Sequence, residues 1–438
     1  MLHGPLAKKM LLFALPLAAS SVLQQMFNAV DVAVVGRFAS SEALAAVGSN
    51  SPVINLLVNL FVGISMGANV VLANHIGQKN DNGVRRSVAT SAVVAVFSGL
   101  FLMVLGLLVA RPILELMGAP ENVIDLATLY LRIYFLGMPF IMVFNFGSAI
   151  LRSMGDTRRP LLCLVVSGVV NTVLNLVLVI GFGRGVDGVA IATVVANVVN
   201  AVMVVVMLRR EKGPVRLDVR HLDVAWPELR KMLQIGVPAG VQGMVFSLSN
   251  VVIQSAINSF GSAAMGGSAA GLTYEQFCYF FMSAYCGAAV TFVGQNFGAG
   301  QKERCRRVFR LCMLMAVVTS LVLNLGIAAG RGFFISLFTA DPAVAAYASE
   351  RILMALMFQT LACGYEVSGA VLRGMGHSAL PAVIVIFGTC LLRLAWVYLA
   401  VPLHPTFGFL LAVYPISWVV TSMLVLGAYW RVARRELA

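Results

Sequence analysis

Apolar residues occur along the whole chain in long runs, and short polar segments separate these runs. A run of about 20 residues, wound as a helix that rises about 1.5 Å per residue, crosses the roughly 30 Å hydrocarbon core of a bilayer. The pattern predicts about twelve spans, at residues 10–36, 50–74, 88–110, 123–150, 160–181, 186–208, 232–259, 267–295, 306–329, 343–372, 380–401 and 407–430. We therefore expect an all-α, polytopic membrane protein.

The composition supports this interpretation. The 438 residues are 60% hydrophobic and 11% charged, with a mean hydropathy of +0.90, whereas a soluble domain is about 25% charged. The net charge of +13 comes from basic residues in the short connections between apolar runs, which favours membrane orientation over nucleic-acid binding. The seven cysteines occur singly, without a CxxC pair, and we interpret them as packing residues.

The basic residues also predict an orientation. Alternate connections, on one side of the membrane, contain most of the 31 Lys and Arg residues. Because cytoplasmic connections are enriched in Lys and Arg, we expect both termini to be cytoplasmic and the protein to lie in the cell (inner) membrane.

The two halves of the sequence resemble each other. The segment from Leu151 to Pro160 recurs from Leu372 to Pro381, sharing Leu-Arg-x-Met-Gly, and Pro16 recurs as Pro238 at an offset of 222 residues (238 − 16). Each half contains an even number of spans, so the halves share one orientation, as in parallel-repeat transporters. We predict two six-helix lobes, residues 1–208 and 232–438, joined by a cytoplasmic linker at 209–231.

The first span carries one polar stripe. At steps of four, four and three residues, its members fall on one helix face: Ser20, Gln24, Asn28 and Asp31. A carboxylate within a span is costly unless it faces a partner or a water-filled cavity, so Asp31 is a functional-site hypothesis. Pro16 is expected to bend this helix. The alternative is that Asp31 lies near the outer interface and pairs with Arg37.

Three further polar residues lie at similar membrane depths to Asp31. These are Asn171, Asn175 and Thr193, on the fifth and sixth spans. Such a group suits a proton or a sodium ion, because hard oxygens bind sodium and a desolvated carboxyl group can carry a proton. The alternative is a neutral hydrogen-bond network that only packs helices. We expect no cofactor and no metal beyond sodium at Asp31.

The second half is not an electrostatic copy of the first, because Ile253 takes the position of Asp31. Depth favours an ion pair between Glu275 and Arg393, although Glu275 or Glu366 could instead bind cationic substrates. We predict a polar or substrate-binding cavity lined by Gln24, Asn28, Asn250, Glu275, Glu366 and Arg393.

The sequence lacks the motifs of energy-coupled or catalytic chemistry. It contains no GxxxxGK[ST] phosphate loop and no HExxH or similar arrangement. We therefore expect a transporter, not an enzyme, that uses an ion gradient in place of ATP. Its expected partners are small organic substrates and membrane lipid, without nucleic acid, and the expected state is a monomer.

Several motifs together resemble the multidrug and toxic compound extrusion (MATE) family, and within it the DinF-like members. They are Phe27-Asn28-Ala-Val-Asp31-Val-Ala-Val-Val-Gly36-Arg37, Ala43-Leu-Ala-Ala-Val-Gly48, Gln295-Asn-Phe-Gly-Ala-Gly300 and the paired Leu-Arg-x-Met-Gly segments. The resemblance implies two six-helix lobes around a cavity that opens alternately to each side, with efflux driven by inward proton or sodium movement.

The resemblance also implies roles for individual residues. Asp31 would be the cation carboxylate and Pro16 the bending point, with Asn171, Asn175 and Thr193 completing the site. Asn175 departs from the Asp found in family members, so this site has one carboxylate fewer. Second-lobe acids of another branch fall on Phe246 and Ala362, so Glu275 and Glu366 inherit no role.

The predicted function is secondary active multidrug efflux: organic, cationic or amphipathic compounds leave by alternating access in exchange for H⁺ or Na⁺. A flippase for lipid-linked saccharides is the alternative, and it predicts a cavity rich in Arg and Lys, whereas we place only Arg393 inside a span. An uncoupled channel or receptor would show no ion dependence of flux.

Overall fold

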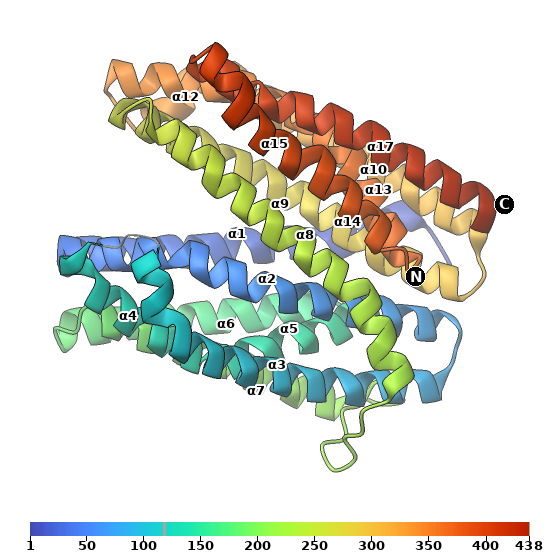
Figure 1. Ribbon diagram of the computed structural model, residues 1–438. Coiled ribbons are helices and arrows are strands. Elements are labelled where there is room, and N and C mark those ends of the chain that lie inside the picture. The colour runs from blue at the N-terminus through green and yellow to red at the C-terminus, as the bar shows by residue number, and fades with distance from the viewer. Residues whose placement is uncertain (117–119, 438) are drawn as a thin grey trace. The chain divides into compact units, whose positions relative to one another are not determined.

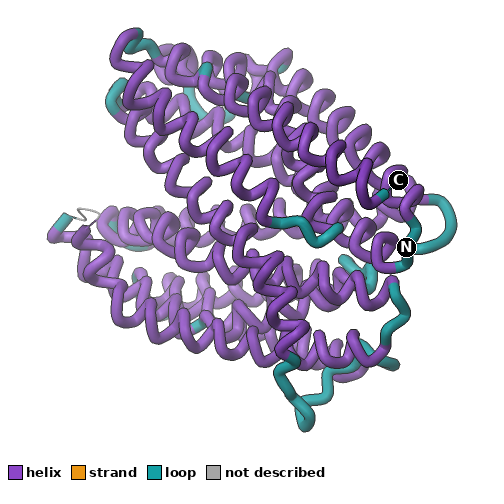
Figure 2. The backbone as a smooth tube through the Cα atoms, turned by 45° about the vertical axis from the view of Figure 1, so that its right-hand side comes forward, coloured by secondary structure: helices purple, strands orange, loops and turns teal. Residues whose placement is uncertain are grey.

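The computed structural model describes residues 1–116 and 120–437, and helices make up nearly all of this part of the chain (Figures 1 and 2). Among the described residues, eleven helices are long and apolar enough to cross a membrane, and one bent pair of shorter helices raises the number to as many as 12. The predicted all-α, multi-pass fold is therefore confirmed.

In the first half of the chain, the described residues form seven α-helices and one π-helical segment. They are α1 (Leu6–Phe38), α2 (Ser41–Gly77), α3 (Asp81–Leu116), α4 (Glu121–Leu136), α5 (Met138–Ser153), α6 (Arg158–Asn175), η1 (Leu176–Gly181) and α7 (Val186–Arg210).

The second half has more interruptions in its helices. The elements are α8 (Trp226–Asn258), α9 (Ser262–Gly298), α10 (Lys302–Ala329), α11 (Arg331–Ser336), α12 (Pro342–Met354), η2 (Leu356–Ala362), α13 (Cys363–Gly374), α14 (Ala379–Val385), η3 (Ile386–Leu391), α15 (Leu392–Ala395), η4 (Trp396–Ala400), η5 (Val401–Leu403), α16 (Phe407–Leu411) and α17 (Val413–Glu436).

The predicted span 123–150 is broken in the structure. It forms α4 and α5, which meet at an angle of 48°. Gly137 lies at the junction and Pro139 in the first turn of α5. Proline has no backbone N–H to donate to the preceding turn, so the helix bends at the junction just before Pro139.

The chain forms two compact units, and their boundaries differ from those of the predicted lobes. The N-unit is residues 19–240, and the C-unit is residues 1–18 together with 241–438. Both passages from one unit to the other lie inside helices, α1 and α8. In each helix, the boundary between the units lies two residues after a proline of the sequence repeat, Pro16 in α1 and Pro238 in α8.

Glycines attach the first part of α8 to α2 within the N-unit. Two Gly-x-x-x-Gly pairs face each other, Gly63 with Gly67 and Gly236 with Gly240. A methyl group on Gly236 would lie 2.4 Å from the Cα atom of Ile64, and one on Gly67 would lie 2.2 Å from the carbonyl oxygen of Met232. Only glycine permits backbones to approach so closely, as in membrane helix pairs generally.

The connection between α7 and α8 packs on the N-unit. Val215 and Leu217 are buried among core residues of that unit. The backbone N–H of Leu217 donates to the carbonyl of Leu208 at 3.0 Å, and the N–H of Ala225 donates to Thr90 Oγ1 at 3.0 Å. The connecting segment therefore has fixed contacts within one unit.

In the C-unit, α9, α10, α13 and α17 lie side by side (Figure 1). The N-terminus lies at the end of this bundle where α10 begins, because Arg304 Nη2 donates to the carbonyl of Met1 at 3.0 Å. The last turns of α17 lie at the same end, since the rings of Phe309 and Tyr429 stack at 4.0 Å. Both termini thus lie at one end of the C-unit, while their location in the cytoplasm stays a prediction.

The repeated Leu-Arg-x-Met-Gly segments form the same turn in both halves. Gly155 and Gly376 have φ angles of 97° and 93°. In each turn the residue after the glycine bonds back to the repeat leucine, at 3.1 Å to Leu151 and 2.8 Å to Leu372. This is the left-handed helix end that favours glycine, so the sequence repeat reflects a structural one.

Candidate functional site

Asp31 is buried within the N-unit and bonded to an amide. Its side chain is 8% exposed, and that of Asn175, at the end of α6, is fully buried. Asn175 Nδ2 donates to Asp31 Oδ1 and, at 3.2 Å, to Asn171 Oδ1 one turn earlier on α6. The predicted interface pair is wrong, because Asp31 makes no ion pair with Arg37 among the described residues.

Thr193 on α7 completes a closed group of four side chains. Its Oγ1 lies 3.5 Å from Asp31 Oδ2 and accepts from Asn171 Nδ2 at 3.4 Å. The same hydroxyl donates to the carbonyl of Val189 at the shorter distance of 3.0 Å. Since a hydroxyl has one proton, Asp31 Oδ2 retains acceptor capacity.

A second oxygen in this group also retains acceptor capacity. Asn175 Oδ1 is buried and has no hydrogen-bond partner in the described part of the chain. Buried polar atoms are nearly always paired, so an unpaired amide oxygen beside a carboxylate is an acceptor that a cation or a proton donor would satisfy. The residues present therefore fit a small monovalent cation.

Local packing explains how α1 reaches this position. Gly168 on α6 leaves space for the ring of Phe27, because a Cβ atom there would lie 1.8 Å from Phe27 Cε2. This contact lies one turn before Asp31 and brings α1 close to α6. The α-helix changes to the π-helical η1 directly after Asn175, and π segments inside helices are frequent at functional sites.

The remaining polar residues of the α1 stripe do not join this group. Gln24 and Asn28 are exposed, and neither hydrogen-bonds to Asp31 among the residues that the structure describes. Pro16 lies inside the continuous helix α1, within the C-unit part of that helix. The predicted cavity roles of Gln24 and Asn28 stay predictions.

The predicted pair between Glu275 and Arg393 is wrong, because Glu275 pairs with Arg351. Arg351 on α12 donates from Nε and Nη2 to the two carboxylate oxygens at 2.6 and 3.0 Å, and from Nη1 to Ser268 Oγ at 2.6 Å. Gly271 on α9 leaves the space that the Arg351 side chain occupies. Both charged groups are buried, so this is a complete internal ion pair.

Sequence reasoning missed Arg351. From the sequence we placed only Arg393 inside a span, although Arg351 also lies inside the predicted span 343–372. The argument that identified Asp31, a charge within an apolar run, applies equally to Arg351 and was the signal that could have found it.

The other predicted residues of the second half lie apart from that pair. Glu366 is half-buried and accepts a long hydrogen bond from Tyr279 Oη at 3.4 Å. Arg393 donates to Asn250 Oδ1 at 3.3 Å and to Ser417 Oγ at 3.2 Å. The structure therefore brings Asn250 and Arg393 together, and adds Ser417, which the sequence did not suggest.

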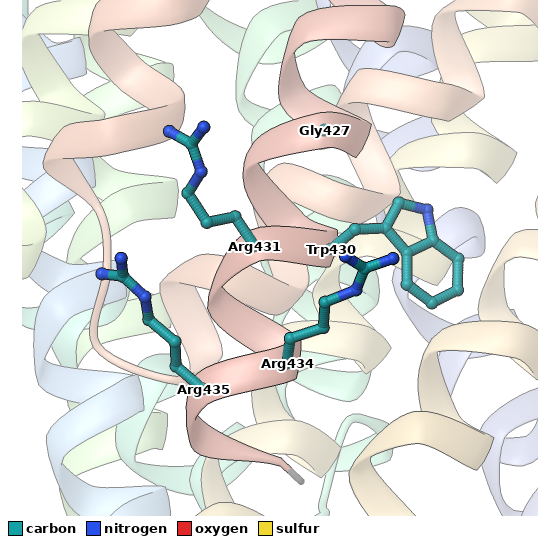
Figure 3. A pocket seen from close by; sticks show the side chains of 5 residues that line it. All are labelled: Gly427, Trp430, Arg431, Arg434 and Arg435. Carbon is teal, nitrogen blue, oxygen red and sulfur yellow. The ribbon is translucent and has the colours of Figure 1, made fainter.

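A pocket of about 690 Å³ lies at the C-terminal end of α17 (Figure 3). In Figure 3, the side chains of Arg431 and Arg435 extend from one side of the helix, and that of Arg434 lies beside Trp430. Three guanidinium groups make this pocket unsuitable for cations. It shares no residue with the Asp31 group.

Comparisons with known proteins agree with the membrane fold. The MatE family model matches residues 16–177 and 238–399. The probable multidrug resistance protein YoeA of Bacillus subtilis (strain 168) is 32% identical over 98% of this chain and 94% of its own length. An FAD transporter of Shewanella oneidensis is 25% identical over 85% of this chain and 82% of its own. The crystal structure of MATE in the bent conformation superposes with a TM-score of 0.89 at 21% identity, covering 98% of this chain and 96% of that one.

Proposed function

Because the chain belongs to the MatE family of multidrug and toxic compound extrusion transporters, we propose that it is a secondary active antiporter. It exports organic, cationic or amphipathic compounds by alternating access, in exchange for H⁺ or Na⁺. We also propose that it acts as a monomer in the inner membrane, with both termini in the cytoplasm. The family membership makes the protein a transporter and not an enzyme.

One observation supports ion coupling above the others. Asp31 is buried against Asn175 with two oxygens, Asp31 Oδ2 and Asn175 Oδ1, that have spare acceptor capacity. A proton or a sodium ion on Asp31 would cancel the charge and replace hydrogen bonds that now join α1 to α6 and α7. The ion thereby favours one arrangement of α1 over another.

Coupling requires only that ion and substrate prefer different states of the same element. In the proposed cycle, the ion-bound state of α1 releases substrate outward and the ion-free state accepts it from inside. Bending of α1 at Pro16, which removes one backbone hydrogen bond from the helix, would separate the two states.

The test is substrate-induced ion movement in proteoliposomes, with proton and sodium gradients imposed separately. Wild-type protein should respond to one of the gradients. Asp31→Asn should abolish coupled efflux, about a hundredfold or more, while the protein still reaches the membrane, because an amide cannot exchange a charge. Asp187→Asn, which removes a half-buried acid paired with Arg184 at 2.8 Å, is the matched control and should transport normally.

The alternatives predict other results. Flux that persists unchanged in Asp31→Asn, or that ignores both gradients, contradicts the antiporter and supports an uncoupled channel. Movement of a lipid-linked saccharide without any response to small organic compounds supports the flippase. The names of the relatives, which include both drug resistance and FAD transport, leave the substrate to experiment.

A further inference from the structure

Arg393 is a buried guanidinium group with no carboxylate partner in the described part of the chain. Its side chain is 1% exposed, and within the described residues it takes part in no ion pair. Its two hydrogen bonds, at 3.2 and 3.3 Å, go to the neutral oxygens of Ser417 and Asn250. The remaining N–H groups have no acceptor in the described part of the chain, although a guanidinium has five donors and stays protonated in proteins.

Aromatic rings surround the same guanidinium group. Its central carbon lies 4.8 Å from the ring centre of Tyr414 and 5.2 Å from that of Phe246. Such contacts attract a cation without cancelling its charge. Arg351, in the same unit, shows the contrasting case, since it also lies 5.4 Å from Tyr414 but has both oxygens of Glu275.

The sequence repeat relates Arg393 to the proposed cation site. The family model matches two segments of equal length, 16–177 and 238–399, that begin 222 residues apart (238 − 16). At that offset Asn171 corresponds to Arg393 and Asp31 to Ile253. One half of the repeat therefore has a buried acid among amides, and the other has a buried base beside the amide of Asn250.

Helix irregularity marks both positions. Arg393 lies in α15, a four-residue α-helical segment between the π-helical segments η3 and η4, and η1 follows Asn175 in the first half. A π segment leaves backbone groups less regularly paired and re-aims side chains, and it is frequent at functional sites. Asn250, which accepts a hydrogen bond from one edge of the guanidinium, is itself exposed.

We propose that Arg393, with Asn250 and Ser417, binds an anionic group of the exported compound, a carboxylate or a phosphate. The planar guanidinium fork matches both groups in bidentate geometry. A bound anion supplies the charge that the buried guanidinium lacks in the surrounding C-unit. This inference rests on the proposed function and narrows its substrates to amphipathic or zwitterionic compounds that carry an acidic group.

The test measures binding of two matched dyes to the purified full-length protein in detergent by fluorescence polarisation. One is a rhodamine dye with a free carboxylate, and the other is its methyl ester, which has the same rings but no acid. Wild-type protein should bind the free acid about tenfold more tightly than the ester, as expected for one charge-assisted bidentate contact.

Substitution of Arg393 should remove this preference alone. In Arg393→Gln the acid and the ester should bind equally, with the affinity for the ester unchanged, which also shows that the variant is folded. Arg393→Lys should restore part of the preference for the acid, because lysine keeps the positive charge but cannot form the two parallel hydrogen bonds of a guanidinium group. Gln254→Ala, one turn from Asn250 on α8 and bonded only to Asn258 among the described residues, is the control and should keep the full preference.

Three results would overturn the proposal. They are equal binding of acid and ester by wild-type protein, a preference that survives in Arg393→Gln, and a parallel loss of both affinities in that variant. The first result is measured on wild-type protein, so a folding defect in a variant cannot cause it. Ion coupling is tested separately, by transport in Asp31→Asn, so a result against antiport can be distinguished from a result against anion binding at Arg393.

Discussion

Asp31, the pair of Glu275 and Arg351, and Arg393 are buried charged groups that differ in what surrounds each of them. Asp31 is bonded to an amide, Glu275 and Arg351 neutralise each other, and Arg393 has only neutral acceptors and aromatic rings. A buried ion pair with full hydrogen bonding holds helices together, whereas a buried charge without a counter-charge is costly and is retained where a ligand uses it. We therefore assign a structural role to Glu275 and Arg351 and functional roles to Asp31 and Arg393.

The structural role predicts a large loss of stability when one partner is removed. Glu275→Gln leaves the Arg351 guanidinium buried without a counter-charge, and the expected cost is about 3–5 kcal/mol of unfolding free energy. The double variant Glu275→Leu with Arg351→Met removes both charges and should recover most of that loss. Thermal unfolding in detergent measures both variants. A double variant no more stable than the single one would contradict the assignment.

Thr193 allows a second test at the proposed cation site. Thr193→Val keeps the side-chain volume and removes the hydroxyl that lies 3.5 Å from Asp31 Oδ2. We expect the ion concentration for half-maximal transport to rise about three- to tenfold, because one oxygen ligand or hydrogen bond to the ion is lost. The measurement is efflux against ion concentration in proteoliposomes. A change in maximal rate with no change in ion dependence would place Thr193 outside the site.

Among the elements, α8 shows how close backbone packing assigns part of a helix to one unit. The first part of α8 packs on α2 through facing glycines, and its Glu228 Oε2 lies 2.8 Å from His75 Nε2 on the last turn of α2. Both of those side chains are buried. These contacts explain why residues up to Gly240 belong to the N-unit although the repeat places the whole helix in the second half.

Gly236→Val tests the contact between α8 and α2. The added Cβ would lie 2.4 Å from the Cα atom of Ile64, so the helices must separate, at a cost of about 1–3 kcal/mol typical of overpacking. Gly326→Val on α10, where no atom lies within 4 Å of an added Cβ, is the matched control. Fluorescence-detected thermal unfolding should show a lower midpoint for the first variant only. Equal midpoints would mean that the glycine contact does not hold α8 in place.

At the level of the whole molecule, apolar runs and helix depth predicted the spans and the convergence of Asp31, Asn171, Asn175 and Thr193. Depth arguments work there because each residue's position along its own helix is fixed by the rise per residue. They failed for Arg393 because partner choice depends on how each helix is rotated about its axis, and depth carries no information on rotation. The bend between α4 and α5 was missed because both pieces are apolar.

The cytoplasmic linker at residues 209–231 stays a prediction, but its packing was not foreseen. Charge and proline content suggested a tether between two lobes, whereas Val215, Leu217 and Glu228 are buried within the N-unit. Three separate buried residues are too few to produce an apolar run that the sequence analysis would detect. The predicted lobes, 1–208 and 232–438, stay a prediction, since the compact units divide the chain elsewhere.

Cleavage of this segment tests how the units are connected. A protease site inserted at Gly213, an exposed residue with a φ of 84°, would separate residues 1–212 from the rest of the chain. We expect the two fragments to co-elute in mild detergent and to transport at near the uncut rate, because α8 remains packed on α2. Fragments that separate on size-exclusion chromatography would show that this connection, and not the helix contact, joins them.

The chain passes from one unit to the other within two helices, in α1 after residue 18 and in α8 after residue 240. Asp31 lies on α1, about 20 Å along the helix axis from residue 18. A change of charge at that carboxylate therefore acts on the same helix that continues into the C-unit, and no loop interrupts the backbone between the two points.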